Sequence, residues 1–397
     1  MIHSIRQAYN QAFSPERYQA FLDQIHRDYP GQLDFRVAET PVFVPKALKN
    51  RLLEACDSII DTLTREDFKR LSEAAIPPGQ RVPNENEHTS FLAIDFAICQ
   101  DEKDELSPQL IELQGFPSLY GFQSYLSANF RKHFPIPEGF SHLFDVDSDE
   151  TYRQHLHRLI VGLEPPEQVI LLEIYPEKQK TRIDFAITEK MLGIEAVCLT
   201  KIQKEGRTLF YEKAGQRYHI KRIYNRLIFD ELENLPDLKT AFSLTDDVEV
   251  EWIGHPNWFF RISKHTLPLL KSPYVPESHY LNTLETYPDD LENYVLKPLF
   301  SFAGSGVKLS VSKAALDAIP DKENYLLQRK VHYVPVIQSP DGLVKCEIRM
   351  LYIWHDKDPR PTLLTNLARL SRGEMIGVRF NKDFDWVGGT ICFFEEG

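Results

Sequence analysis

Residues 168–199 constrain the fold most strongly, because they read as a strand, a helix and a second strand in succession. Residues 168–174 form a short apolar run, 180–192 have helical periodicity, and 194–199 form another apolar run. Two strands joined by a helix over some thirty residues pair in parallel, with the helix against one face of their sheet. We therefore expect an α/β (α+β) fold.

The chain before this unit divides into a helical part and a hairpin. Residues 1–88 are expected to be mostly helical, since a run such as 47–63 places apolar residues three and four positions apart and so gives one buried stripe per helix. Residues 91–99 and 109–114 have the composition of strands, and the charged turn 101–105 lies between them. This pattern predicts a β-hairpin.

Length, charge and cysteine usage restrict the class of protein. A chain of 397 residues is long enough for two or three domains, and its net charge of −12 argues against a nucleic-acid partner or an anionic membrane surface. No run is apolar enough for a leader peptide or a bilayer span. The five cysteines are scattered and form no C-x-x-C pair, which is typical of reduced core residues. We expect a cytoplasmic protein.

A glycine loop near the C-terminal end is the first candidate binding element. Residues 294–300 are expected to form a strand that leads into the loop 301–306, and 307–311 a strand that leaves it. Glycines let a backbone approach an anion closely, although an ordinary glycine turn has the same composition. Lys297 lies in the otherwise apolar strand, where an ammonium is costly unless it meets an anion. The alternative is an edge lysine whose charge reaches solvent.

Acidic and amide side chains on the predicted hairpin are the second candidate. Because strand side chains alternate, Glu112 and Gln114 share one face, and Asp95 shares a face with Ala93 and Ala97. Oxygen-bearing side chains grouped on one side of a hairpin suit a hard cation such as Mg²⁺. The alternative is a polar face that only meets water.

Basic residues form the third candidate group. In residues 346–354, alternation places Glu347 and Arg349 together, opposite Ile348 and Met350. The group also includes Arg369, Arg372, Lys221, Arg222 and Arg226, which lie outside this strand. Arginine suits phosphate and carboxylate groups because its forked donors match paired oxygens, but surface salt bridges explain many such residues equally well.

Together these segments resemble the ATP-grasp superfamily in its circularly permuted form, as in the glutathionylspermidine synthetase-like carboxylate–amine ligases. Ordinary ATP-grasp enzymes end with a Glu-x-Asn metal motif. Here its counterpart, Glu112-Leu-Gln114, precedes the βα segment, Lys264, Lys297 and the glycine loop, and Gln replaces the usual Asn. The resemblance covers residues 89–397 and assigns nothing to the first 88.

The resemblance implies a circularly permuted ATP-grasp fold with a βαβ pre-ATP-grasp domain and a helical N-terminal segment. Its parts would be the helical segment 1–88, a displaced metal-binding part of the ATP-grasp core at 89–165, the pre-ATP-grasp βα domain at 166–284, and the ATP-binding part of the core at 285–397.

The resemblance also implies site residues and an activity. ATP and Mg²⁺ would be the cofactors of a ligase that joins a carboxylate to an amine through an acyl phosphate, on small-molecule or peptide substrates. An inactive ATP-binding module and a phosphotransferase are the alternatives, and the oligomeric state stays open. The implied ATP-binding residues are Lys264, Lys297, Ser301, Gly304, Ser305, Gly306 and Gln328; the implied metal ligands are Asp95, Glu112 and Gln114. Arg349 and Arg369 are our candidates for holding the carboxylate or acyl phosphate, from strand parity and charge.

Overall fold

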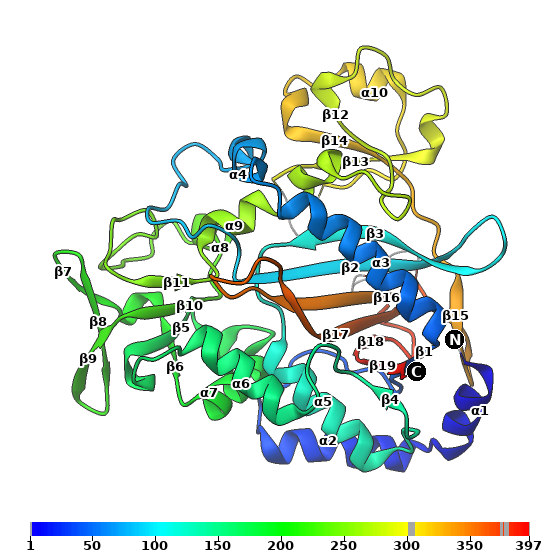
Figure 1. Ribbon diagram of the computed structural model, residues 1–397, viewed down its shortest axis with the longest axis horizontal. Helices are drawn as coiled ribbons and strands as arrows, with labels where there is room; N and C mark the ends of the chain where they lie inside the picture. Colours follow the sequence, from blue (N-terminus) through cyan, green and yellow to red (C-terminus); the bar gives the residue numbers. More distant parts are fainter. Residues whose placement is uncertain (1, 301–305, 374–375, 377–380, 397) are drawn as a thin grey trace.

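The largest sheet combines strands from both halves of the chain (Figure 1). In this computed structural model, which describes residues 2–300, 306–373, 376 and 381–396, its antiparallel strands lie in the order β18-β17-β16-β2-β3, and β15 pairs with β16. The strands are β2 Phe91–Gln100, β3 Leu106–Gln114, β15 Pro335–Ser339, β16 Gly342–Ile353, β17 Thr362–Ser371 and β18 Gly388–Thr390. The predicted hairpin is confirmed as β2 and β3.

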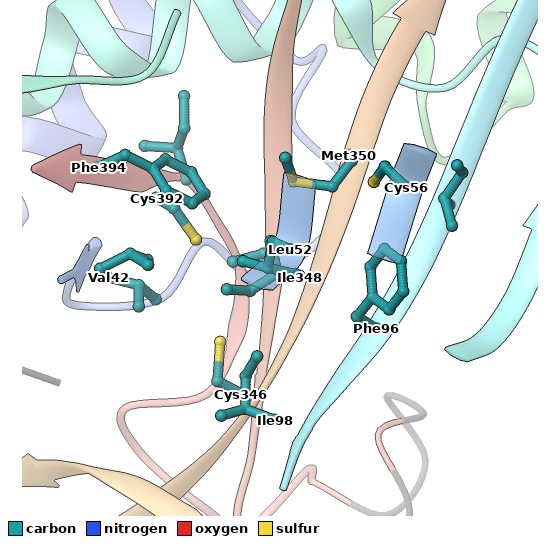
Figure 2. Packing of buried hydrophobic residues seen from close by; sticks show 14 of the residues in the cluster. Val42, Leu52, Cys56, Phe96, Ile98, Cys346, Ile348, Met350, Cys392 and Phe394 are labelled. Carbon is teal, nitrogen blue, oxygen red and sulfur yellow. The ribbon is translucent and has the colours of Figure 1, made fainter. Parts of the chain in front are cut away.

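Helix α3, Lys46–Leu63, covers one face of this sheet, as its apolar stripe predicts. Figure 2 shows Leu52 and Cys56 of the helix beside Phe96, Ile348 and Met350 of the strands. All five side chains are buried. The free cysteines behave as predicted for core residues, since Cys56, Cys99, Cys346 and Cys392 are buried and Cys198 is partly buried.

The opposite face of the large sheet is partly covered by a second layer. A parallel sheet in the order β11-β10-β5-β6 and helices α5 and α6 share a buried cluster with the large sheet. The elements are α5 Tyr120–His133, α6 Asp149–Ile160, β5 Val169–Glu173, α7 Arg182–Leu192, β6 Glu195–Cys198, β10 Arg222–Asn225 and β11 Glu251–Ile253. The predicted strand–helix–strand unit is confirmed as β5, α7 and β6. A small antiparallel sheet, β7 Gln203–Glu205, β8 Thr208–Lys213 and β9 Gln216–Ile220, extends from this layer (Figure 1).

A third, smaller unit lies at the top of Figure 1. Its antiparallel sheet has the order β12-β14-β13, with β12 Ser278–Tyr280, β13 Tyr294–Pro298 and β14 Tyr325–Arg329, and it packs against α10 Lys313–Asp317. The prediction of a strand at 307–311 is wrong. Only Lys308 forms a bridge there, to Leu296, because the chain turns away to α10, whose first turn is capped by the Ser312 hydroxyl.

The N-terminal part contains helices and one strand that the sequence pattern did not indicate. Strand β1, Val42–Val44, pairs in parallel with β19, Cys392–Glu395, and β4, Phe140–Ser141, pairs with the other side of β19. The remaining α-helices are α1 His3–Ala12, α2 Pro15–Asp28, α4 Phe68–Leu71, α8 Phe229–Glu233 and α9 Pro256–Arg261. The 3-10 helices are η1 Glu73–Ala75, η2 Pro166–Gln168, η3 Pro176–Lys178, η4 Leu199–Lys201, η5 Lys264–Leu269, η6 Leu281–Thr283, η7 Leu291–Asn293 and η8 Lys322–Asn324. Among the described residues, no helix has both the length and the apolar character needed to cross a bilayer.

Candidate functional site

The face of the large sheet opposite α3 changes character along its strands. Toward one end, Phe91, Leu351 and Leu367 are buried against the second layer. Further along the same face, the register places Asp95 directly opposite Arg349, and Glu347 directly opposite Arg369. The predicted strand parity is therefore confirmed, and charged side chains occupy the part of this face that the apolar cluster does not extend over.

Asp95, Glu347, Arg349 and Arg369 form a charge cluster at this position, in which both carboxylates are buried and the Arg369 side chain is 39% exposed. Arg349 donates from Nε to Oδ1 of Asp95 at 2.5 Å and from Nη2 to Oδ2 at 2.6 Å, and Arg369 Nη2 donates to the same Oδ2 at 2.9 Å. Arg369 also pairs with Glu347, whose other oxygen accepts a 2.8 Å hydrogen bond from the Tyr333 hydroxyl. Asp95 is 1% exposed and Glu347 is 3% exposed. The four charges thus neutralise one another within the protein.

The electrostatics of the cluster keep its arginines charged. Burial alone would lower the pKa of Arg369, but the carboxylates of Glu347 and Asp95 outweigh it and raise that pKa. Burial raises the pKa of Glu347, and the Arg369 guanidinium acts in the opposite direction. Both arginines can therefore act as fixed positive charges over any pH at which the protein is folded.

Two lysines from different parts of the chain approach Glu112 beside this cluster. Lys264 begins η5 and is 8% exposed, and its Nζ donates to the backbone oxygen of Pro298 at 3.1 Å. Pro298 directly follows Lys297 on β13, so this bond joins the two lysine-bearing segments. Burial lowers the pKa of Lys264, and burial lowers that of Lys297 to about 8, while the Glu112 carboxylate raises both. Lys297 also responds to Lys264 and Glu347, which places all four charges in one electrostatic environment.

A cavity of about 240 Å³ opens beside Glu112 and Lys264. Its walls come from η1 and the connector after it, the hairpin, α8, α9 and the end of β13. The lining residues are Ala75, Pro77, Gln80, Glu112, Asp230, Glu233, Phe259, Phe260, Ser263, Lys264, Leu299 and Phe300. Residues 75–80 belong to the N-terminal part to which the resemblance assigned nothing, so this part contributes one wall of the candidate site.

The other predicted nucleotide-binding residues lie on or near the small sheet. Gln328 is opposite Val295 and two positions from Leu326, the partner of Lys297, so Gln328 and Lys297 share a face. Its amide nitrogen donates to the Ser278 hydroxyl at 3.0 Å. Gly306 has a φ of +71°, and a side-chain Cβ there would lie 2.8 Å from Pro298, so only glycine fits without a shift. Ser301, Gly304 and Ser305 lie outside the described residues.

The three predicted metal ligands differ in whether their side-chain oxygens are already bonded within the protein. Glu112 is partly exposed beside the lysines, and no ion pair within the described part of the chain involves it. Gln114 lies on the same face, opposite Ala93. Asp95, by contrast, has both oxygens occupied by guanidinium groups. Within residues 2–300, 306–373, 376 and 381–396, no three His, Cys, Asp or Glu side chains are arranged to hold a metal ion. The metal role of Asp95, Glu112 and Gln114 stays a prediction.

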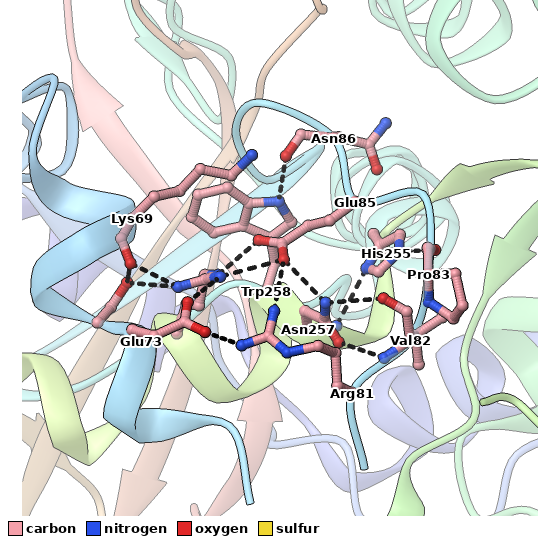
Figure 3. A network of polar contacts seen from close by, with 12 residues as sticks. Lys69, Glu73, Arg81, Val82, Pro83, Glu85, Asn86, His255, Asn257 and Trp258 are labelled. Atoms are coloured by element: carbon pink, nitrogen blue, oxygen red, sulfur yellow. Dashed lines mark hydrogen bonds and ion pairs between the residues drawn. The ribbon is translucent and has the colours of Figure 1, made fainter. Parts of the chain in front are cut away.

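A polar network that sequence reasoning missed fixes the helix before Lys264 (Figure 3). Arg261 of α9 is 3% exposed; it pairs with Glu85 and Glu73 and donates to the backbone oxygen of Lys69 at 2.6 Å. Asn257 in the same helix accepts from the backbone N–H of Val82 at 2.9 Å and donates back to its carbonyl oxygen at 3.0 Å. The connector after η1 is thereby attached to the helix that leads into Lys264. The charged residues at 81–87 were the available signal, but nothing in the sequence named their partners.

Comparisons with known proteins identify the fold and no family. No protein-family model matches the chain, and no curated protein matches it. A solved structure that resembles it is a glutathione synthetase-like effector, GSS30, from Globodera pallida in its apo form. The TM-score is 0.62 at 10% sequence identity, and the match covers 96% of each chain, including the N-terminal part. This chain therefore has a mixed α/β, glutathione synthetase-like fold.

Proposed function

We propose that the chain is an ATP- and Mg²⁺-dependent ligase that joins a carboxylate to an amine through an acyl phosphate, on a circularly permuted ATP-grasp core. The observation that carries the proposal is the meeting of Lys264, Lys297 and Glu112 beside the paired arginines on one sheet face. These groups come from three segments, and Glu112 lies far from both lysines in the sequence. The hairpin that carries Glu112 precedes both lysines, and this order supports the permuted arrangement.

Each residue has a role that follows from its position. Lys264 and Lys297 would neutralise the phosphates, and the backbone around Gly306 would close over them. Gln328 would offer its amide to the base from the same face of the small sheet. Mg-ATP, when bound, supplies the phosphoryl group that makes a carboxylate reactive toward an amine. Arg349 and Arg369 would hold the carboxylate and stabilise the negative charge that develops on it.

The test supplies the purified protein with Mg-ATP and panels of carboxylic acids and amines, and measures ADP release together with product mass. A ligase releases ADP and phosphate only when both substrates are present, and its product has the mass of the two joined with loss of water. Lys297→Ala is expected to abolish this turnover. The control, Lys313→Ala, removes an exposed lysine of α10 and is expected to leave it unchanged. Turnover that survives Lys297→Ala, or a phosphorylated acid as the final product, contradicts the proposal.

An ATP-binding module without catalysis is the second candidate, and the closed Asp95 cluster favours it. A carboxylate that two arginines already neutralise is a poor ligand for a further cation. This candidate predicts that ATP raises the midpoint of thermal unfolding while no substrate pair yields a product. A condensation product measured by mass would exclude it.

A further inference from the structure

The contacts of Asp95 are those of a carboxylate that holds arginine side chains in place. Its two oxygens receive a parallel pair of bonds from Arg349, at 2.5 and 2.6 Å, and a third bond from Arg369 at 2.9 Å. Forked pairs of this kind are among the strongest polar contacts between side chains. Since Asp95 is 1% exposed, the two guanidinium groups surround it in place of water.

The strand register, and not a chance rotamer, produces this contact. Asp95 of β2 is the direct cross-strand partner of Arg349 of β16, and Arg369 of β17 is the direct partner of Glu347 on the same strand. Side chains of such partners begin about 5 Å apart on the same face. Ser118 fixes the remaining edge of Arg349 by accepting a bond from Nη1 at 2.7 Å. The arrangement is therefore built into the sheet.

Glu112 differs from Asp95 in its exposure and in the partners of its carboxylate. It lies opposite Asp95 on the neighbouring strand, is partly exposed, and lines the cavity that contains Lys264. No ion pair among the described residues occupies its carboxylate. A divalent cation at Asp95 would have to displace guanidinium groups that are hydrogen-bonded to both carboxylate oxygens, whereas the positive side chains near Glu112 act on it without an ion pair among the described residues.

We propose that Asp95 is not a metal ligand of this site but a positioning residue that holds Arg349 and Arg369. The positioning role stands on the contacts of the ligand-free protein. The exclusion of Asp95 from cation binding rests on the proposed function, because it assumes that a metal–nucleotide complex binds here. The two parts are tested separately.

The first test measures thermal unfolding without any ligand. Asp95→Asn removes the carboxylate that pairs with the buried Arg349 and leaves Arg369 with Glu347 as its partner among the described residues, so we expect the midpoint to fall by about 5–10 °C. Arg349→Met added to Asp95→Asn is expected to restore part of that loss. The control Glu112→Gln should lower the midpoint less than Asp95→Asn does, because this carboxylate is partly exposed and forms no ion pair with another described residue. If Asp95→Asn alone does not fold, recovery of folded protein in the double variant supports the positioning role.

Two outcomes of the unfolding measurement would contradict the positioning role of Asp95. If Arg349 and Arg369 did not depend on Asp95, Asp95→Asn would leave the midpoint of the ligand-free protein unchanged or raise it. An unchanged or raised midpoint, or a double variant no more stable than Asp95→Asn, would overturn the positioning role.

The second test uses Mn²⁺ and ADP, with electron paramagnetic resonance to count bound ions and calorimetry to measure affinity. We expect one Mn²⁺ per protein–ADP complex, at least tenfold weaker Mn²⁺ binding in Glu112→Gln, and a change below threefold in Asp95→Asn. Two ions per complex, one of them lost in Asp95→Asn, would refute the exclusion of Asp95 from cation binding. Failure of the wild-type protein to bind ADP would refute the proposed function, while the unfolding measurements still decide the role of Asp95.

Inorganic phosphate added to the ADP complex probes the arginines themselves. If Asp95 positions them, Asp95→Asn weakens phosphate binding at least tenfold and leaves ADP affinity within threefold, because the lysines that hold ADP are untouched. Equal losses for phosphate and ADP would indicate a general structural defect and would count against positioning.

Discussion

The charge of Lys297 should control nucleotide affinity between pH 7 and pH 9. Burial lowers its pKa to about 8 from the ordinary 10.5, with Glu112 and Glu347 acting against that shift and Lys264 adding to it. The ammonium is protonated in about nine-tenths of the molecules at pH 7 and in about one-tenth at pH 9. If only the charged form holds a phosphate, ATP affinity falls about tenfold over this interval, because the phosphate groups are already largely ionised at pH 7 and change little above it.

Calorimetric titration with ATP, without acid or amine substrates, measures this dependence. Lys297→Arg is the matched control: a guanidinium stays charged throughout, so its affinity should be nearly independent of pH. Lys297→Met should bind weakly at every pH. If the wild-type protein and Lys297→Arg lose affinity in parallel as the pH rises, the charge of Lys297 does not govern binding and the reasoning fails.

The stability of the ligand-free protein should respond to the same group with the opposite sign. Because the folded-state pKa of Lys297 lies below its unfolded value, the unfolded state binds more protons between pH 8 and pH 10.5. The contribution of this residue to the free energy of unfolding therefore rises as the pH increases through that window. Comparing wild type with Lys297→Met by urea denaturation at pH 7.5 and pH 9.5 isolates this contribution. If the free energy of unfolding of wild type minus that of Lys297→Met becomes more negative as the pH rises, the assigned direction is wrong.

Two further predictions concern the framework of the site. Arg261→Met removes the buried positive charge that pairs with Glu85, so we expect the free energy of unfolding measured in urea to fall by about 3–5 kcal/mol. The exposed control Arg65→Met should cost at most about 1 kcal/mol. Equal losses would show that the network in Figure 3 adds no stability. Met350→Ala removes a fully buried side chain beneath the charge cluster and should cost about 2–5 kcal/mol, whereas Leu343→Ala, on an exposed side chain of the same strand, should cost less than about 1 kcal/mol.

Local pattern was sufficient to predict individual elements and the faces of their side chains. Alternation in residues 91–99 and the helical spacing in 47–63 correctly predicted β2 and α3, since each pattern reports which side of an element is buried. The strand expected at 307–311 shows the limit of this reasoning. Its alternation is real, but a strand needs a partner along its length, and only Lys308 finds one.

Local pattern could not predict which strands lie next to one another in the fold. Asp95 and Arg349 are 254 positions apart, and parity placed each on a polar face without indicating that β2 and β16 are neighbours. Strand β1 illustrates the same problem, because its three residues pair with β19 at the far end of the chain. Pairing over such separations depends on the whole topology, which periodicity within one segment does not contain.

A sequence motif therefore predicts the function of a site only where it also predicts which residues surround it in the fold. The sequence groups Asp95 with Glu112 as two carboxylates on one hairpin, and both are equally plausible metal ligands on that basis. In the structure one carboxylate faces two arginines from β16 and β17, and the other faces a cavity with a lysine from η5. The chemistry of each group follows from that difference in surroundings. A replacement that changes only the partner, such as Arg349→Met, should therefore change the electrostatic surroundings of the Asp95 carboxylate while leaving every residue of the motif in place.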